Sequence, residues 1–213
     1  METPAMHHLT EIDYEHVYEP AEDTFLMMDA LEKDLDDISS MCPLVIVEVC
    51  AGTGIISASL SHALSQTAFF IAADINQYAC KASYNTMKLN GSQTFQVIRS
   101  DLLSCLGSGF VDILICNPPY VPTSDEELNS ADALTCSWAG GKNGRKVMDR
   151  LFNDVSRLMS PGGKFYILVL KENQPCEIIE FFHGKGFECV NILSRKAGRE
   201  NLSVIKFTKS KIV

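Results

Sequence analysis

The residues of this sequence best suited to chemistry are Asn117-Pro118-Pro119-Tyr120, which follow a short apolar run. The end of a strand would explain the two prolines, because proline has no N–H to donate to a neighbouring strand. It would explain neither Asn117 nor Tyr120. A planar NH2 group has a delocalised lone pair and is a poor nucleophile. Asn117 Oδ1 and the Pro118 carbonyl can accept its two N–H bonds and aim the nitrogen at an electrophile, with Pro119 stiffening the turn and Tyr120 stacking on the planar group. The tetrad therefore predicts methyl transfer to a planar nitrogen.

A second set of residues has the spacing of a nucleoside site. Gly52 and Gly54 follow the apolar run 44–49, where glycine lets the backbone turn tightly and approach a ligand. Asp74 ends the next apolar run, twenty residues after Gly54, where a carboxylate can accept both hydroxyls of a ribose. Asp101, after the third run, is placed to accept an amino N–H of adenine. A tight turn and helix caps would explain each residue separately; together they favour an adenosine-shaped cleft.

The elements that must position these residues alternate along the chain. Short apolar runs predict seven strands, at residues 44–49, 68–73, 95–98, 111–116, 165–170, 189–193 and 202–207. Helices are predicted at 18–31, 55–64, 77–89, 145–159 and 176–183, and 121–144 is predicted to be irregular. This order indicates an α/β fold, a doubly wound, mostly parallel, Rossmann-like sheet in one domain over 17–213. Residues 1–16 are expected to be a disordered or loosely packed tail.

Charge and cysteine content narrow the class further. The net charge is −9, and residues 1–60 hold thirteen acids against one base. A protein that binds duplex DNA through its backbone normally shows a broad basic face, so the charge distribution argues against nucleic acid as a partner. None of the eight cysteines lies in a C-x-x-C pair, so spacing predicts neither a zinc site nor a redox motif. No apolar run is long enough to span a membrane, and a cytoplasmic location, with nuclear presence as well, is expected.

The tetrad and the glycine loop together resemble the HemK family, which methylates the N5 nitrogen of a glutamine side chain in translation release factors. Two further segments are similar to its eukaryotic and archaeal branch, Val17-Tyr18-Glu19-Pro20-Ala21-Glu22-Asp23-Thr24 and Trp138-Ala139-Gly140-Gly141-Lys142-Asn143-Gly144-Arg145-Lys146-Val147-Met148-Asp149-Arg150. So are Lys171-Glu172-Asn173 and the ending 202–210. The resemblance covers about residues 17–210 and implies a class I methyltransferase domain that uses S-adenosyl-L-methionine.

The same resemblance implies roles for individual residues. It makes Asn117 the residue that orients the substrate, next to Pro118, Pro119 and Tyr120, in contact with both substrate and cofactor. The residues implied to line the cofactor are Thr24, Glu48, Cys50, Gly52, Asp74, Asp101 and Leu102. Cys50 is a departure, because the family has glycine there, and a side chain at this point can crowd the methionine end of the cofactor.

Members of this branch work as heterodimers with a small zinc-binding activator, so such a partner is implied. Phe95-Gln96-Val97-Ile98 is expected at a sheet edge and has neither charge nor proline to block strand addition. The implied substrate is the glutamine of a Gly-Gly-Gln loop in a class 1 release factor. An adenine-N6 methyltransferase of DNA or RNA, a protein lysine (histone) methyltransferase, and a cofactor-binding scaffold without catalysis remain as alternatives.

Overall fold

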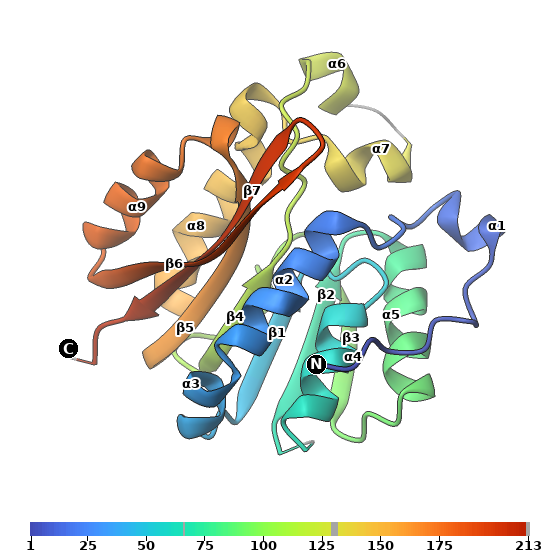
Figure 1. Ribbon diagram of the computed structural model, residues 1–213, viewed down its shortest axis with the longest axis horizontal. Coiled ribbons are helices and arrows are strands. Elements are labelled where there is room, and N and C mark those ends of the chain that lie inside the picture. Colours follow the sequence, from blue (N-terminus) through green and yellow to red (C-terminus); the bar gives the residue numbers. More distant parts are fainter. Residues whose placement is uncertain (66, 129–131, 212–213) are drawn as a thin grey trace.

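The chain forms one seven-stranded sheet in this computed structural model, which describes residues 1–65, 67–128 and 132–211. The strand order is β3-β2-β1-β4-β5-β7-β6. The strands are β1 Val45–Val49, β2 Phe69–Asp74, β3 Phe95–Arg99, β4 Val111–Cys116, β5 Met159–Leu170, β6 Phe187–Ala197 and β7 Glu200–Lys209. β1 to β5 pair in parallel, and β7 runs antiparallel to both β5 and β6. The predicted mostly parallel, doubly wound sheet in a single domain is therefore confirmed (Figure 1).

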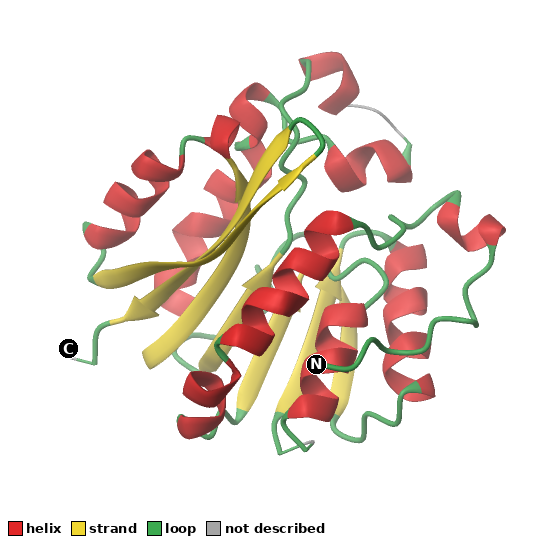
Figure 2. Cartoon of the chain, in the orientation of Figure 1, coloured by secondary structure: helices red, strands yellow, loops and turns green. Residues whose placement is uncertain are grey.

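Helices cover both faces of this sheet, as Figure 2 shows. In the described residues they are α1 Glu11–Tyr14, α2 Glu22–Lys33, α3 Leu35–Ser40, α4 Ile55–Ala63, α5 Gln77–Leu89, α6 Asp125–Leu128, α7 Ala133–Trp138, α8 Lys146–Leu158 and α9 Pro175–His183, with 3-10 turns η1 Lys142–Gly144 and η2 Lys171–Asn173. α2 and α4 cross the near face of the sheet in Figure 1, and α8 lies behind β5. Because both faces are covered, the central strands are buried on both sides, which is why they appear in the sequence as near-continuous apolar runs.

The main differences from the predicted elements lie at their ends. β5 begins at Met159, whereas the sequence predicted a helix to 159 and a strand only from 165. Ser160-Pro161-Gly162-Gly163 reads locally as a turn, but these residues continue the strand through an irregular register against β4. β6 and β7 also extend beyond their predicted ends to form a long hairpin. The stretch 121–144, predicted to be irregular, contains α6, α7 and η1; its residues 129–131 lie outside the described part.

The N-terminal segment runs along α4 and α5. The Ala5 N–H donates to Asn90 Oδ1 at 2.7 Å, and the Ser59 hydroxyl donates to the Glu2 carbonyl at 2.8 Å. Val17 is 2% exposed and packs with Ala79 and Ala82 of α5. The segment therefore contacts the domain from Glu2 onward, while its predicted looseness in solution stays a prediction. Within the described residues, no helix combines the length and apolar character needed to cross a bilayer.

The sheet order fixes where a ligand can bind. β1 lies between β2 and β4, so the chain moves to one side of β1 through β2 and β3 and to the other side through β4 and β5. At such a switch point the connections leave β1 in opposite directions and open a crevice at the carboxyl ends of the strands. The loops after β1, β2 and β4, which carry most of the predicted site residues, meet at this crevice.

Candidate functional site

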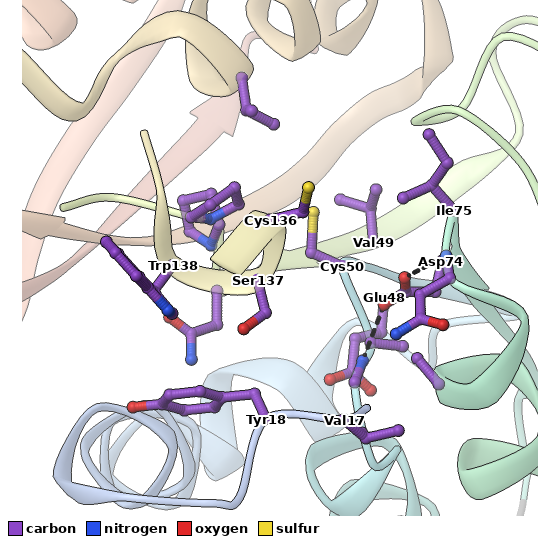
Figure 3. A pocket seen from close by; sticks show the side chains of 18 of the residues that line it. Val17, Tyr18, Glu48, Val49, Cys50, Asp74, Ile75, Cys136, Ser137 and Trp138 are labelled. Carbon is purple, nitrogen blue, oxygen red and sulfur yellow. Dashed lines mark hydrogen bonds between the residues drawn. The ribbon is translucent and has the colours of Figure 1, made fainter. Parts of the chain in front are cut away.

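A cleft of about 730 Å³ opens at the carboxyl ends of β1, β2 and β4. This volume is within the usual range for small-molecule sites. All the sequence-predicted site residues line it: Thr24, Glu48, Cys50, Gly52, Asp74, Asp101, Leu102, Asn117, Pro118, Pro119 and Tyr120. Figure 3 shows Glu48 and Asp74 at one end of the cleft and Tyr18 and Trp138 at the other. The fold therefore gathers both predicted groups of residues into one cleft, with Glu48 and Asp74 apart from Tyr18 and Trp138.

The turn after β1 forms one wall of the cleft with its backbone. Cys50, Gly52 and Gly54 all have positive φ, at 58°, 53° and 74°. A Cβ on Gly54 would lie 2.8 Å from Ser83 Cα, so this glycine lets the turn pack directly on α5. A Cβ on Gly52 would meet no atom within 4 Å, which leaves open space for a ligand beside the backbone. Cys50 is the exception in this turn, because a residue with a side chain adopts the left-handed conformation there.

Two carboxylates hold this turn and face the cleft. Asp74 Oδ2 accepts the Gly52 N–H at 3.0 Å, and its Oδ1 accepts the Asn76 N–H at 2.9 Å. Glu48 is 2% exposed and accepts the N–H of Ser57 at 2.9 Å and also the Ser57 hydroxyl. Burial raises the pKa of Glu48 to about 7, against the opposing effect of the two bonds from Ser57, and the charge of Asp74 raises it further. Burial also raises the pKa of Asp74, and the backbone N–H bonds oppose that shift.

Asp101 and Leu102 continue the wall beyond β3. Asp101 is half-exposed, and its carboxylate pairs with Arg150 of α8 at 2.5 Å. Leu102 is buried with φ of 53°, which turns the chain toward the cleft. Both residues line the cleft where the sequence predicted them. The ion pair with Arg150, which also lines the cleft, was not predicted.

The tetrad after β4 is held from behind by a buried asparagine. Asn173 Nδ2 donates to the Tyr120 carbonyl at 2.8 Å, and its Oδ1 accepts the Leu170 N–H at 2.6 Å. A Cβ on Gly144 would lie 1.8 Å from the same Tyr120 carbonyl oxygen, so only glycine fits there. Both residues belong to segments that carried the family resemblance, but their structural role was not predicted. Asn173 and Gly144 thus fix the backbone that presents the tetrad.

Asn117 makes one hydrogen bond and leaves one buried atom free. Its Nδ2 donates to Asp23 Oδ2 at 3.0 Å. Its Oδ1 is buried without a hydrogen-bond partner in the part of the chain that the structure describes. Buried polar atoms without a partner are rare, and each calls for an explanation such as a ligand. Because Asn117 lines the cleft, its unpartnered Oδ1 is a candidate acceptor for an N–H donor that is not part of the chain.

The sequence did not predict the residues that surround the tetrad across the cleft. Three of them also line the cleft: Tyr18, which precedes α2, Asp23 in α2, and Glu200 at the start of β7. Burial and, next, the charge of Asp23 raise the pKa of Tyr18 and of Tyr120. Burial also raises the pKa of Glu200, with the charge of Asp23 adding to the effect. Tyr18 and Asp23 lie in a segment of the family resemblance, which is the signal that could have identified them; Glu200 has no such signal.

Comparisons with known proteins agree with this geometry. Residues 24–139 match the family model described as "Methyltransferase small domain". The chain is 42% identical to "Methyltransferase HEMK2" of Homo sapiens, over 98% of this chain and 97% of that protein. It is 37% identical to "eRF1 methyltransferase catalytic subunit mtq2" of Schizosaccharomyces pombe, over 97% of this chain and 95% of that protein. A solved structure, the E. cuniculi Mtq2–Trm112 complex responsible for methylation of the eRF1 translation termination factor, has a TM-score of 0.69 and 28% identity, covering 92% of this chain and 99% of that one.

Proposed function

Because the chain belongs to the methyltransferase family that includes HEMK2 and Mtq2, we propose that it uses S-adenosyl-L-methionine to methylate the N5 nitrogen of the glutamine in a Gly-Gly-Gln loop of a translation release factor. The observation that carries the proposal is the buried, unpartnered Oδ1 of Asn117 beside the cleft. A side-chain carboxamide offers the N–H donor that this atom lacks. The Pro118 carbonyl, next in the chain and also lining the cleft, accepts the second N–H.

The cleft fits the proposed cofactor in size and in chemistry. Asp74 has the position of an acceptor for ribose hydroxyls, and the open space at Gly52 lets a ligand approach the backbone of the turn. The other residues predicted to contact the cofactor also line the cleft, namely Thr24, Glu48, Cys50, Asp101 and Leu102. When bound, the cofactor supplies a methyl group on a positively charged sulfur. No strong base is needed at the acceptor, because a nitrogen that has gained a methyl group loses its proton readily.

The role of Asn117 and Pro118 is to orient the acceptor nitrogen. Two acceptor oxygens on one NH2 group fix its plane, so its lone pair can point at the methyl carbon. The same oxygens stabilise the positive charge that develops on the nitrogen during transfer. Tyr120 is 8% exposed, and its ring offers a face to a planar amide. This arrangement lowers the barrier through position and electrostatics.

We also propose that a small zinc-binding activator pairs with the edge strand β3. The edge position of β3 supports this, because an edge strand presents unpaired backbone groups. Tyr84 and Leu89 of the neighbouring α5 are 47% and 42% exposed, and the Tyr84 ring lies 5.6 Å from that of Phe95. A partner that added a strand here would cover these side chains as well. The assembly of the related Mtq2 with Trm112 supports a partner of this kind.

The test uses the purified chain, co-expressed with its candidate activator, and labelled S-adenosyl-L-methionine. Release factor, the same factor with its Gly-Gly-Gln glutamine changed to alanine, a DNA duplex and histone are offered as methyl acceptors. We expect label in the unchanged release factor alone. Asn117→Ala should keep cofactor binding and lose about 10²–10³ in rate, the usual cost of one positioned contact at a transition state. Label mainly in DNA or histone, or most activity kept by Asn117→Ala at saturating substrate, would contradict the proposal.

A further inference from the structure

Asp23 is a buried carboxylate at the centre of the acceptor end of the cleft. It lies in the first turn of α2 and is 3% exposed. Its Oδ1 accepts the Thr24 N–H at 2.8 Å and the Tyr18 hydroxyl at 3.3 Å, and its Oδ2 accepts Asn117 Nδ2 at 3.0 Å. In the described part of the chain, no lysine, arginine or histidine forms an ion pair with it. A buried carboxylate without a cation is costly, and such groups concentrate at functional sites.

The contact with Asn117 decides which end of that amide faces the substrate. An ionised carboxylate only accepts hydrogen bonds, so Asn117 has to turn its NH2 group toward Asp23. Its Oδ1 is then directed away from Asp23, and this is the buried atom that lacks a partner. If the amide were reversed, two oxygens would face each other, and an N–H donor would point toward the acceptor nitrogen. Asp23 therefore excludes the orientation that would repel an incoming NH2 group.

We propose that Asp23 is the positioning residue that sets the orientation of the Asn117 amide, and so makes the site specific for a side-chain NH2 group over an oxygen of the same shape. The inference rests on the proposed function, because it assigns a role within the same transfer. Glutamine and glutamate are nearly identical in shape but differ in whether the group facing Asn117 is an N–H donor. With Asp23 in place, a glutamate side chain would face two acceptors, Asn117 Oδ1 and the Pro118 carbonyl, whereas a glutamine side chain would be bound by them.

The experiment compares Asp23→Asn with wild type in the full chain, together with the activator if the complex proves necessary. Asparagine at 23 keeps the size of the side chain but can donate as well as accept, so Asn117 becomes free to reverse. Peptides with a Gly-Gly-Gln and a Gly-Gly-Glu core serve as probes, and binding of each is measured at saturating cofactor. We expect the preference for the glutamine peptide to fall at least tenfold, with a fall of about tenfold in the single-turnover rate and cofactor affinity within about twofold of wild type.

Two further variants sharpen this test. Asp23→Ala removes the contact altogether and should cost more in rate than Asp23→Asn, about 10²-fold. Asp29→Asn makes the same chemical change on the same helix, at a residue that pairs with Arg195 and does not line the cleft, and should leave the preference unchanged. Thermal unfolding of each variant checks the fold, and if Asp23→Ala fails to fold, Asp23→Asn alone decides.

The outcomes separate the two proposals. A wild-type protein that transfers no methyl group to release factor refutes the proposed function. A wild-type protein that does so, with an Asp23→Asn variant of equal rate and equal preference for glutamine, overturns the role of Asp23 alone. An Asp23→Asn variant that loses cofactor affinity while its preference is unchanged also overturns it, because Asp23 would then belong to the cofactor site.

Discussion

Burial of the Glu48 carboxyl should make the stability of the protein depend on pH near neutrality. Burial raises the pKa of Glu48 to about 7 in the folded chain, against an ordinary value of 4.5. The folded state therefore holds the Glu48 proton more tightly than the unfolded state does. Ionisation of this group costs stability, and the cost appears as pH rises from about 4.5 to about 7. At about 1.4 kcal/mol for each pKa unit, the full cost above pH 7 is roughly 3 kcal/mol.

The variant Glu48→Gln tests this reasoning, because glutamine cannot ionise. It keeps an oxygen that can accept from Ser57, so the local hydrogen bonds can persist. At pH 8 we expect the variant to have a larger free energy of unfolding than wild type, by up to about 3 kcal/mol. At pH 4.5 most of this advantage should be absent, since Glu48 is then protonated in the folded state. Cofactor affinity should fall, because the family resemblance places Glu48 against the cofactor.

Urea unfolding at pH 4.5, 6 and 8 measures the difference directly. The slope of free energy against urea should be the same for both proteins, which shows that the surface exposed on unfolding is unchanged. Glu188→Gln makes the same chemical change on the exposed face of β6 and is the matched control. A constant difference between Glu48→Gln and wild type across this range would refute the reasoning, because it would mean that Glu48 does not titrate there.

Four other substitutions test the turn and the edge strand. Asp74→Ala should weaken cofactor binding by about 2–3 kcal/mol in calorimetry, because two charge-assisted hydrogen bonds to the ribose are lost. An unchanged affinity with an intact fold would mean that Asp74 only stabilises the turn. Cys50→Gly should be tolerated, because relief of a left-handed conformation, about 1–2 kcal/mol, outweighs the entropy cost of glycine, about 0.5–1 kcal/mol. It should also tighten cofactor binding, because it removes a side chain next to the cofactor; severe loss of binding would show that the turn depends on cysteine. Thr94 and Ser100 both hydrogen-bond to β2, so by the alternation of backbone groups along a strand the Val97 N–H points away from the sheet. Val97→Pro should therefore break the complex with the activator more than it destabilises the chain. Ile98→Pro, on the inward side, should destabilise the chain itself in thermal unfolding, and equal effects of the two prolines would argue against pairing at β3.

Much of the site could be predicted because its residues lie at the ends of strands with a clear sequence pattern. The run before Glu48 and the run before Asn117 are apolar and rich in β-branched residues, and parallel strands bring their carboxyl ends together. Local sequence could not predict the contact between Asp23 and Asn117, because these residues are 94 positions apart and meet only through the fold. Asp23 looked like a helix start signal, and in the structure it also lies in the first turn of α2.

Other differences have equally local causes. Pro161 and the two glycines after it are typical of a turn, yet β5 pairs with β4 on both sides of them, at Met159 and at Lys164, so tertiary context overrides the local preference. The helices α1 and α3 have four and six residues, too few to show an apolar period. The positive φ of Cys50 was not predicted either, although the family glycine at this position is consistent with it.

The position of Trp138 has a practical consequence for studying this protein. It is the single tryptophan of the chain, and it lines the cleft near Tyr18 (Figure 3). Its carbonyl accepts the N–H of Val121, the residue that follows the tetrad, at 3.0 Å. The wavelength of indole fluorescence shifts with the polarity of the surroundings of the ring, and here all indole fluorescence comes from one ring beside the acceptor site. The protein therefore carries its own optical probe, so that cofactor and peptide occupancy can be titrated by intrinsic fluorescence without a label.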